Sequence, residues 1–156
     1  MIARAVDSPL MLADLSATEA FGRRLAGQLR ARDVVTLEGP LGAGKTALAR
    51  AVIRTLLGAT EADVPSPTFT LVQTYDAPDG LAIWHVDLYR LDGPSDVIEL
   101  GLDDAFDHGL TLIEWPDRMG SSLPRDRLAL HFSPPVDDHR AVIIREHGAW
   151  QGRLVL

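Results

Sequence analysis

The chain contains no cysteine, which excludes a disulfide framework and thiolate chemistry and favours a cytoplasmic location. It has no apolar run near the roughly 20 residues that a membrane-spanning helix requires. Its first residues, MIARAVDSPL, lack the apolar core of a secretory signal. Basic residues are also few, and the net charge is −7. Direct electrostatic binding of nucleic acid is therefore disfavoured, and any RNA is expected to be held by a partner.

Lysine is almost absent, since Lys45 is the only lysine among the 15 Lys and Arg residues. It lies in GPLGAGKT, residues 39–46, which matches the GxxxxGK[ST] pattern of a phosphate-binding P-loop. A short apolar run precedes the motif and a helical pattern follows it, as such a loop requires. Glycines let successive backbone amides turn toward a phosphate. A compact ammonium at Lys45 reaches the β- and γ-phosphates, where the planar guanidinium of arginine does not fit. The residues predicted to contact the nucleotide are Gly39, Leu41, Gly42, Ala43, Gly44, Lys45, Thr46 and Ala47.

Apolar periodicity predicts a three-layer P-loop NTPase-like α/β fold with a mixed parallel and antiparallel sheet, formed as one domain over residues 1–156. Helices are expected at 15–30 and 45–58, the first opened by a capping box of Ser16 and Glu19 and the second closed by Gly58. Short helical turns are expected within 93–109. The predicted strands are 33–39, 68–76, 80–91, 110–115, 127–132 and 141–147, with antiparallel hairpins around 77–80 and 133–140.

Two carboxylates end apolar strands and are candidates for the metal that accompanies a nucleotide. Glu114 ends LTLIE and resembles a Walker B carboxylate more closely than Asp87, which ends AIWHVD. Each could instead be a solvated strand end or a cap. Thr46 offers a hydroxyl to Mg²⁺ in the usual P-loop manner. One carboxylate can hold Mg²⁺ while the other orients water, and the sequence leaves open which of the two contacts the metal directly. Trp115 follows Glu114 and either packs in the core or contacts the site.

A proline-bounded stretch, VPSPTFT, precedes the predicted hairpin. Pro65 and Pro67 stiffen it and present the hydroxyls of Ser66 and Thr68. In nucleotide switches a threonine so placed responds to the γ-phosphate through the metal. An ordinary entry into a strand explains the pattern equally well.

Five motifs in register, GPLGAGKT, SPTFTLVQTY, HVDLYRL, IELGLDD and LIEWPDR, closely resemble the bacterial TsaE family of tRNA threonylcarbamoyladenosine biosynthesis. The resemblance covers about residues 16–133. It implies a small cytoplasmic ATPase that works with a TsaB–TsaD heterodimer and meets tRNA only through those partners. Phe69 and Pro40 depart from the tyrosine and aspartate frequent in the family, at positions that tolerate the change.

The resemblance places Mg²⁺ at Thr46 and Glu114, hydrolysis at Asp87, and a switch-like loop at Thr68. Lys45, Asp87 and Thr68 are therefore the candidate catalytic residues. The family also implies a base site between the segment before the first helix and a late loop, for which Leu15 and His139 are the candidates. The expected ligands are ATP and ADP, and the protein alone is expected to be a monomer.

The hypothesis is hydrolysis of the β–γ bond by an activated water, slow in the isolated protein because no arginine stands out as a finger in cis. A nucleotide-gated binding module with little hydrolysis remains open. A small-molecule P-loop kinase is a weaker alternative because no arginine-rich lid is found. A GTPase is disfavoured by the lack of an NKxD motif.

Overall fold

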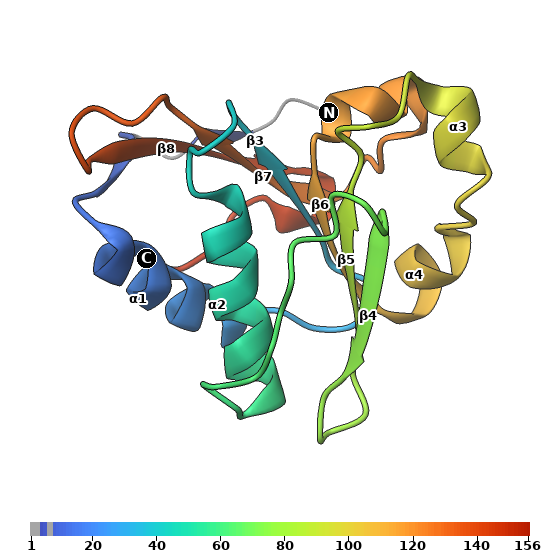
Figure 1. Cartoon of the computed structure of the whole chain (residues 1–156), viewed down its shortest axis with the longest axis horizontal. Coiled ribbons are helices and arrows are strands. Elements are labelled where there is room, and N and C mark those ends of the chain that lie inside the picture. Colours follow the sequence, from blue (N-terminus) through green and yellow to red (C-terminus); the bar gives the residue numbers. More distant parts are fainter. Residues whose placement is uncertain (1–3, 6–7) are drawn as a thin grey trace.

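The computed structural model describes residues 4–5 and 8–156, which form a mixed β-sheet between two layers of helices (Figure 1). The strands are β1 (Arg4–Ala5), β2 (Leu10–Leu12), β3 (Val34–Glu38), β4 (Val72–Asp76), β5 (Ala82–Asp87), β6 (Leu110–Glu114), β7 (Arg127–Phe132) and β8 (Arg140–His147). The helices are α1 (Leu15–Ala26), α2 (Lys45–Leu57), α3 (Pro94–Ile98) and α4 (Asp103–His108), and the 3₁₀ segments are η1 (Pro116–Ser122) and η2 (Gly148–Trp150). No helix in the described part of the chain is both long and apolar enough to cross a membrane.

Strand β3 lies in the middle of the sheet, whose order is β1-β8-β7-β3-β6-β5-β4, with β2 also paired to β8. The pairs β3–β6, β3–β7 and β5–β6 are parallel, and β4–β5 and β7–β8 are antiparallel hairpins. The predicted mixed sheet and both hairpins are thus confirmed. The parallel arrangement puts the carboxyl ends of β3, β5 and β6 at one edge, where the P-loop follows β3.

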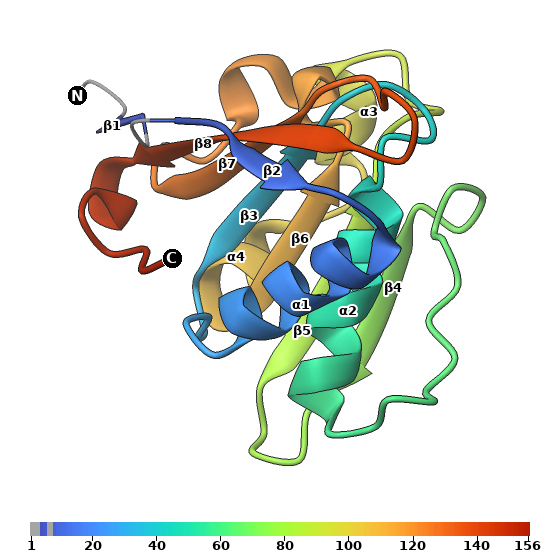
Figure 2. The ribbon, with the colours of Figure 1, turned by 90° about the vertical axis from the view of Figure 1, so that its left-hand side faces the viewer.

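The two faces of the sheet are covered by different helices, which confirms the three-layer architecture (Figures 1 and 2). Helices α1 and α2 pack on one face, in a core that includes Val35 and Leu37 of β3. Segments α3, α4 and η1 cover the other face, in a smaller core that includes Val34. Alternate residues of a strand point to opposite faces, so β3 contributes side chains to both cores.

The first helix differs in detail from the prediction. Asp14, not Ser16, is its N-cap, and the Asp14 carboxylate accepts a 2.8 Å bond from the amide of Ala17. Aspartate is a strong N-cap, so it starts the helix before the predicted capping box. The helix ends at Ala26 rather than continuing to residue 30, since the next amides, of Gln28 and Leu29, bond three residues back, to Leu25 and Ala26. The short edge strands β1 and β2 were also not predicted.

Candidate active site

The P-loop joins β3 to α2 and has the conformation that its glycines permit. Gly39 has φ of 142° and Gly44 has φ of 105°, values that disfavour any residue with a side chain. A Cβ atom on Gly39 would also lie 2.7 Å from the carbonyl oxygen of Phe132. Gly44 is the N-cap of α2 and provides no side-chain hydrogen bond. The first amides of α2 therefore remain available to an anion at the positive end of the helix.

Lys45 is buried at the start of α2, with only 4% of its surface exposed. Its ammonium donates to the carbonyl oxygens of Gly39 and of Pro40, the latter at 3.3 Å. It also lies 3.7 Å from the ring centroid of Trp115. Burial lowers the pKa of Lys45, and the nearby carboxylates of Glu114 and Asp87 oppose that shift. The sequence motif thus produces a desolvated cation beside two anions, the setting in which electrostatic interactions are strongest.

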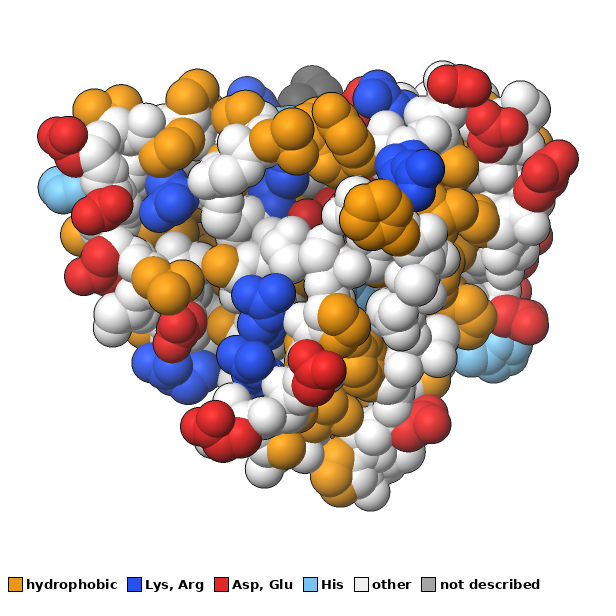
Figure 3. Space-filling model, viewed as in Figure 1, with side chains coloured by type: hydrophobic (Ala, Val, Ile, Leu, Met, Phe, Trp, Pro, Cys, Tyr) orange, Lys and Arg blue, Asp and Glu red, His pale blue; other side chains and the backbone are white. Residues whose placement is uncertain are grey.

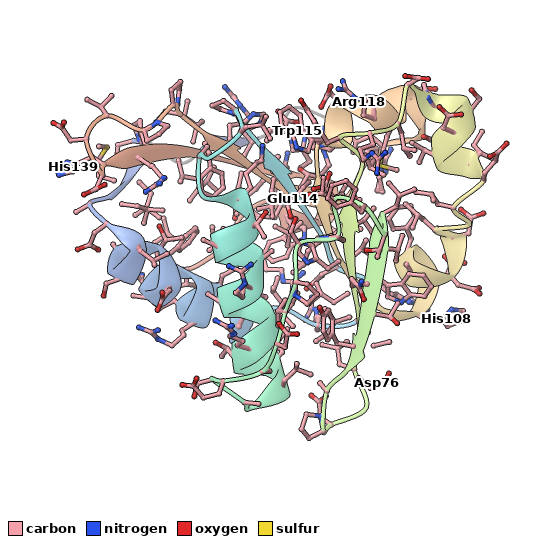
Figure 4. The ribbon with its side chains drawn as sticks, in the orientation of Figure 1. Asp76, His108, Glu114, Trp115, Arg118 and His139 are labelled. Carbon is pink, nitrogen blue, oxygen red and sulfur yellow. The ribbon has the colours of Figure 1, made fainter. Side chains whose placement is uncertain are left out.

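Glu114, the last residue of β6, is held at both carboxylate oxygens. The hydroxyl of Thr46 donates to Oε1 at 2.7 Å, and Nε2 of His85 lies 2.7 Å from Oε2. Glu114 is buried, and Figure 4 places its side chain at the upper end of the sheet, next to Trp115. The bond to Thr46 connects the end of β6 directly to the first turn of α2.

Asp87, the last residue of β5, is also buried and hydrogen-bonded at both oxygens. The backbone amide of Tyr89 donates to Oδ1 at 2.9 Å, and the hydroxyl of Thr68 donates to Oδ2 at 3.2 Å. Ser66 and Thr68 share a further 2.8 Å bond. Burial raises the pKa of Asp87 above its ordinary value, and the charge of Glu114 adds to the rise. The proline-bounded loop is therefore attached to the carboxylate through Thr68.

These groups line one cavity of about 310 Å³. Its walls are Leu41, Gly42, Ala43, Gly44, Lys45, Thr46, Ala47, Thr68, Asp87, Glu114, Trp115 and Arg140. Figure 3 shows acidic and basic side chains meeting in a hollow on this face of the molecule. The predicted phosphate, metal and catalytic residues are therefore brought together, and Gly39 adjoins them through its bond to Lys45.

The two candidates for the base site do not line this cavity. Leu15 lines a separate space of about 210 Å³ between α1 and α2. His139 is exposed at the tip of the β7–β8 hairpin, where it forms backbone bonds with Val136, and Figure 4 shows it far from Glu114. Their assignment stays a prediction from the family resemblance.

Two residues of the site were missed by reasoning from the sequence. Arg140 reaches the P-loop from β8, and its guanidinium lies 3.5 Å from the carbonyl oxygen of Gly42. Its Nε is buried without a hydrogen-bond partner among the described residues. No local pattern marks Arg140, because the hairpin alone returns it to the P-loop. His85 had a visible signal, since it lies two residues before Asp87 and thus on the same face of β5.

The family model for "Threonylcarbamoyl adenosine biosynthesis protein TsaE" matches residues 12–142. The chain belongs to the TsaE family. This family acts in tRNA threonylcarbamoyladenosine biosynthesis, so the family resemblance is confirmed.

Curated TsaE proteins from several bacteria are similar over most of the chain. The protein from Rickettsia bellii is 37% identical over 86% of this chain and 92% of its own length. The one from Bacillus subtilis is 39% identical over 80% of this chain and 77% of its own length. Among solved structures, Bacillus subtilis YdiB superposes with a TM-score of 0.76 and 28% identity, covering 97% of this chain and 92% of YdiB. The sequence similarity to TsaE proteins and the structural similarity to YdiB therefore both extend over most of the chain.

Proposed function

We propose that this protein is a Mg²⁺-dependent ATPase that hydrolyses ATP in support of tRNA threonylcarbamoyladenosine biosynthesis. The observation that supports this most is the cavity itself. It combines the P-loop, the buried Lys45 and two strand-end carboxylates, Asp87 and Glu114. P-loop NTPases combine a phosphate-binding loop and its lysine with a strand-end carboxylate for the metal and a residue that positions water, because their catalysis consists largely of positioning and charge stabilisation.

The residues present fit a magnesium ion. Thr46 donates its proton to Glu114, which leaves the lone pairs of the threonine oxygen available to a hard cation. Mg²⁺ prefers oxygen ligands and is usually bound by one or two carboxylates together with waters and phosphates. Among the described residues, no cluster of three or more His, Cys, Asp or Glu could form a complete metal cage. Thr46 and Glu114 would therefore hold Mg²⁺, which supplies charge neutralisation on the β- and γ-phosphates when bound.

The other side chains have distinct roles in this proposal. Lys45 and the first amides of α2 bind the phosphates and stabilise the charge that develops on the transferred group. Asp87 orients the attacking water, and its raised pKa suits a group that accepts a proton. Thr68 holds Asp87 through its hydroxyl, so ordering of the 65–70 loop is coupled to the position of the carboxylate.

A TsaB–TsaD heterodimer is the proposed partner, and the isolated protein is expected to turn over slowly. Arg140 is the only arginine lining the cavity in the part of the chain that the structure describes. Its guanidinium is bound to the carbonyl oxygens of Gly42 and Asp138, against the backbone of the P-loop and the hairpin. A group supplied in trans can raise the rate by roughly 10³- to 10⁵-fold in comparable systems.

The experiment is ATP turnover by the purified protein, alone and with the heterodimer. Lys45→Ala and Glu114→Ala serve as inactive controls. Strong stimulation that both substitutions abolish supports the partner-gated ATPase. Tight ATP binding without turnover in either setting would support the nucleotide-gated binding module instead.

A further inference from the structure

We infer that His85 is a positioning residue, which orients the Glu114 carboxylate toward the metal-binding edge of the site. This inference rests on the proposed function and assigns a role to a residue that neither the P-loop motif nor the two carboxylates include. The observation behind it is the 2.7 Å contact between Nε2 of His85 and Oε2 of Glu114.

The surroundings of His85 show why the contact is directional. His85 has no exposed surface and lies on the face of β5 that packs under α2, in line with Ile83 and Asp87. Its partner in β6 is Leu112, and both Ile83 and Leu112 belong to the larger apolar core. An imidazole in such a place gains a hydrogen bond only at its Glu114 end.

The protonation pattern of the ring follows from the two nitrogens. An ionised carboxylate only accepts hydrogen bonds, so against such a Glu114 the ring of His85 donates to Oε2 through its Nε2–H. Nδ1 is buried and has no hydrogen-bond partner among the described residues. The Nε2–H tautomer leaves Nδ1 as a bare acceptor, and it avoids burying an unsatisfied N–H donor.

His85 and Thr46 therefore bind different oxygens of the Glu114 carboxylate. His85 binds Oε2 on the side of the sheet interior, and Thr46 binds Oε1 at the start of α2. Removal of the His85 donor leaves Glu114 held only at Oε1 by Thr46, so the carboxylate can then turn about that single bond. Groups that orient a metal-binding side chain in this way typically change metal affinity by about 10- to 100-fold when removed.

The test compares His85→Gln, His85→Asn and His85→Leu with the wild type. Glutamine keeps an N–H donor at a reach similar to Nε2, asparagine is polar but too short, and leucine is apolar. Calorimetry measures ADP affinity with Mg²⁺ and with a chelator, so the readout does not depend on hydrolysis. Thermal unfolding of each variant is recorded in parallel.

We expect Mg²⁺ to tighten ADP binding by the wild type and by His85→Gln. In His85→Asn and His85→Leu, the gain in ADP affinity that Mg²⁺ produces falls by about tenfold. ADP affinity without Mg²⁺ stays unchanged in all three, because Lys45 and the P-loop are untouched. The asparagine variant keeps the comparison meaningful if the leucine variant does not fold.

An unchanged Mg²⁺-dependent gain in His85→Asn overturns the inference and leaves the proposed function intact. Equal loss of ADP affinity with and without Mg²⁺ also overturns it, since that result indicates only a structural role. A wild type whose ADP affinity ignores Mg²⁺ overturns the metal part of the proposed function, and the inference with it.

Discussion

Asp87 and Glu114 are register partners at the last positions of the parallel strands β5 and β6. Their exposed fractions are 3% and 2%, so two carboxylates lie side by side at a buried sheet edge. Both point to the α2 side of the sheet, where Lys45 is the nearby cation. Juxtaposed buried anions are costly unless a cation offsets them, and this cost supports the proposal that Mg²⁺ binds here.

The replacement Asp87→Asn separates catalysis from binding. We expect it to lower turnover by about 10²- to 10⁴-fold, the usual contribution of a positioned proton acceptor, with little change in ATP affinity. Steady-state kinetics and calorimetry measure the two quantities. A variant that hydrolyses ATP at the wild-type rate would remove Asp87 from the mechanism.

The same variant has a predictable effect on stability. The pKa of Asp87 is raised above 3.8 in the folded protein, so the ionised carboxylate lowers the free energy of unfolding at neutral pH. Asp87→Asn removes this cost, and its melting temperature should exceed that of the wild type at pH 7. The difference should shrink as the pH falls through the folded-state pKa, because both side chains are then uncharged. Melting curves from pH 4 to pH 7 measure it, and an advantage that grows on acidification contradicts the prediction.

Lys45→Arg tests whether the P-loop needs an ammonium rather than merely a positive charge. The buried ammonium fits between two loop carbonyl oxygens and the Trp115 ring, and the larger planar guanidinium does not. We expect ATP affinity to fall by roughly 10- to 100-fold, the equivalent of one lost charge-assisted interaction. Circular dichroism checks that the variant is folded. Wild-type affinity in Lys45→Arg would show that shape does not matter at this position.

Thr68→Val and Thr68→Ser test the link between the 65–70 loop and Asp87. Valine keeps the shape of threonine without the hydroxyl, whereas serine keeps the donor. We expect valine to lower kcat by about tenfold, in line with the loss of a hydrogen bond to a charged group, and serine to retain most of it. Partner-stimulated turnover is the measurement. Equal rates in the two variants would indicate that the hydroxyl is not used.

Arg140→Gln is expected to weaken ADP binding by about tenfold, since it removes a cation that lines the P-loop cavity. Arg145→Gln is the matched control, because Arg145 lies on the same strand and is exposed outside the cavity. Calorimetry at two salt concentrations measures both. An equal effect in the two variants would point to overall charge rather than to a contact by Arg140.

Gly22→Ala tests the close approach of α1 and α2. A Cβ atom on Gly22 would lie 2.6 Å from the Cβ of Ala51, so the helices must move apart. We expect a loss of about 1–3 kcal/mol in the free energy of unfolding by urea. Gly27→Ala makes the same change where a Cβ meets nothing nearer than 3.6 Å, and it should be neutral or slightly stabilising. A Gly22→Ala variant with the wild-type free energy of unfolding would show that α1 and α2 can move apart without loss of stability.

Sequence reasoning predicted which residues meet in the cavity where the determining interactions are local. The P-loop depends on glycines and one lysine within eight residues, and Asp87 and Glu114 are found by their position after apolar runs. It failed where distant segments decide the outcome. The edge strands β1 and β2 exist only through pairing with β8, and Arg140 reaches Gly42, 98 residues earlier in the chain, because a hairpin brings it back. The contact of His85 with Glu114 likewise depends on the neighbouring strand, although the His85–Asp87 spacing was a usable signal.

The backbone at Trp115 has a left-handed conformation, with φ of 60°, immediately after Glu114. This turn brings the indole ring against Lys45, with its centroid 4.8 Å from that of the Tyr89 ring. The remaining tryptophans, Trp84 and Trp150, pack in the two cores. An ammonium that leaves the indole for a phosphate changes the electric field on the ring. The indole is thus an intrinsic fluorophore on the wall of the P-loop cavity, and we expect its emission to change when a nucleotide binds there, without any added label.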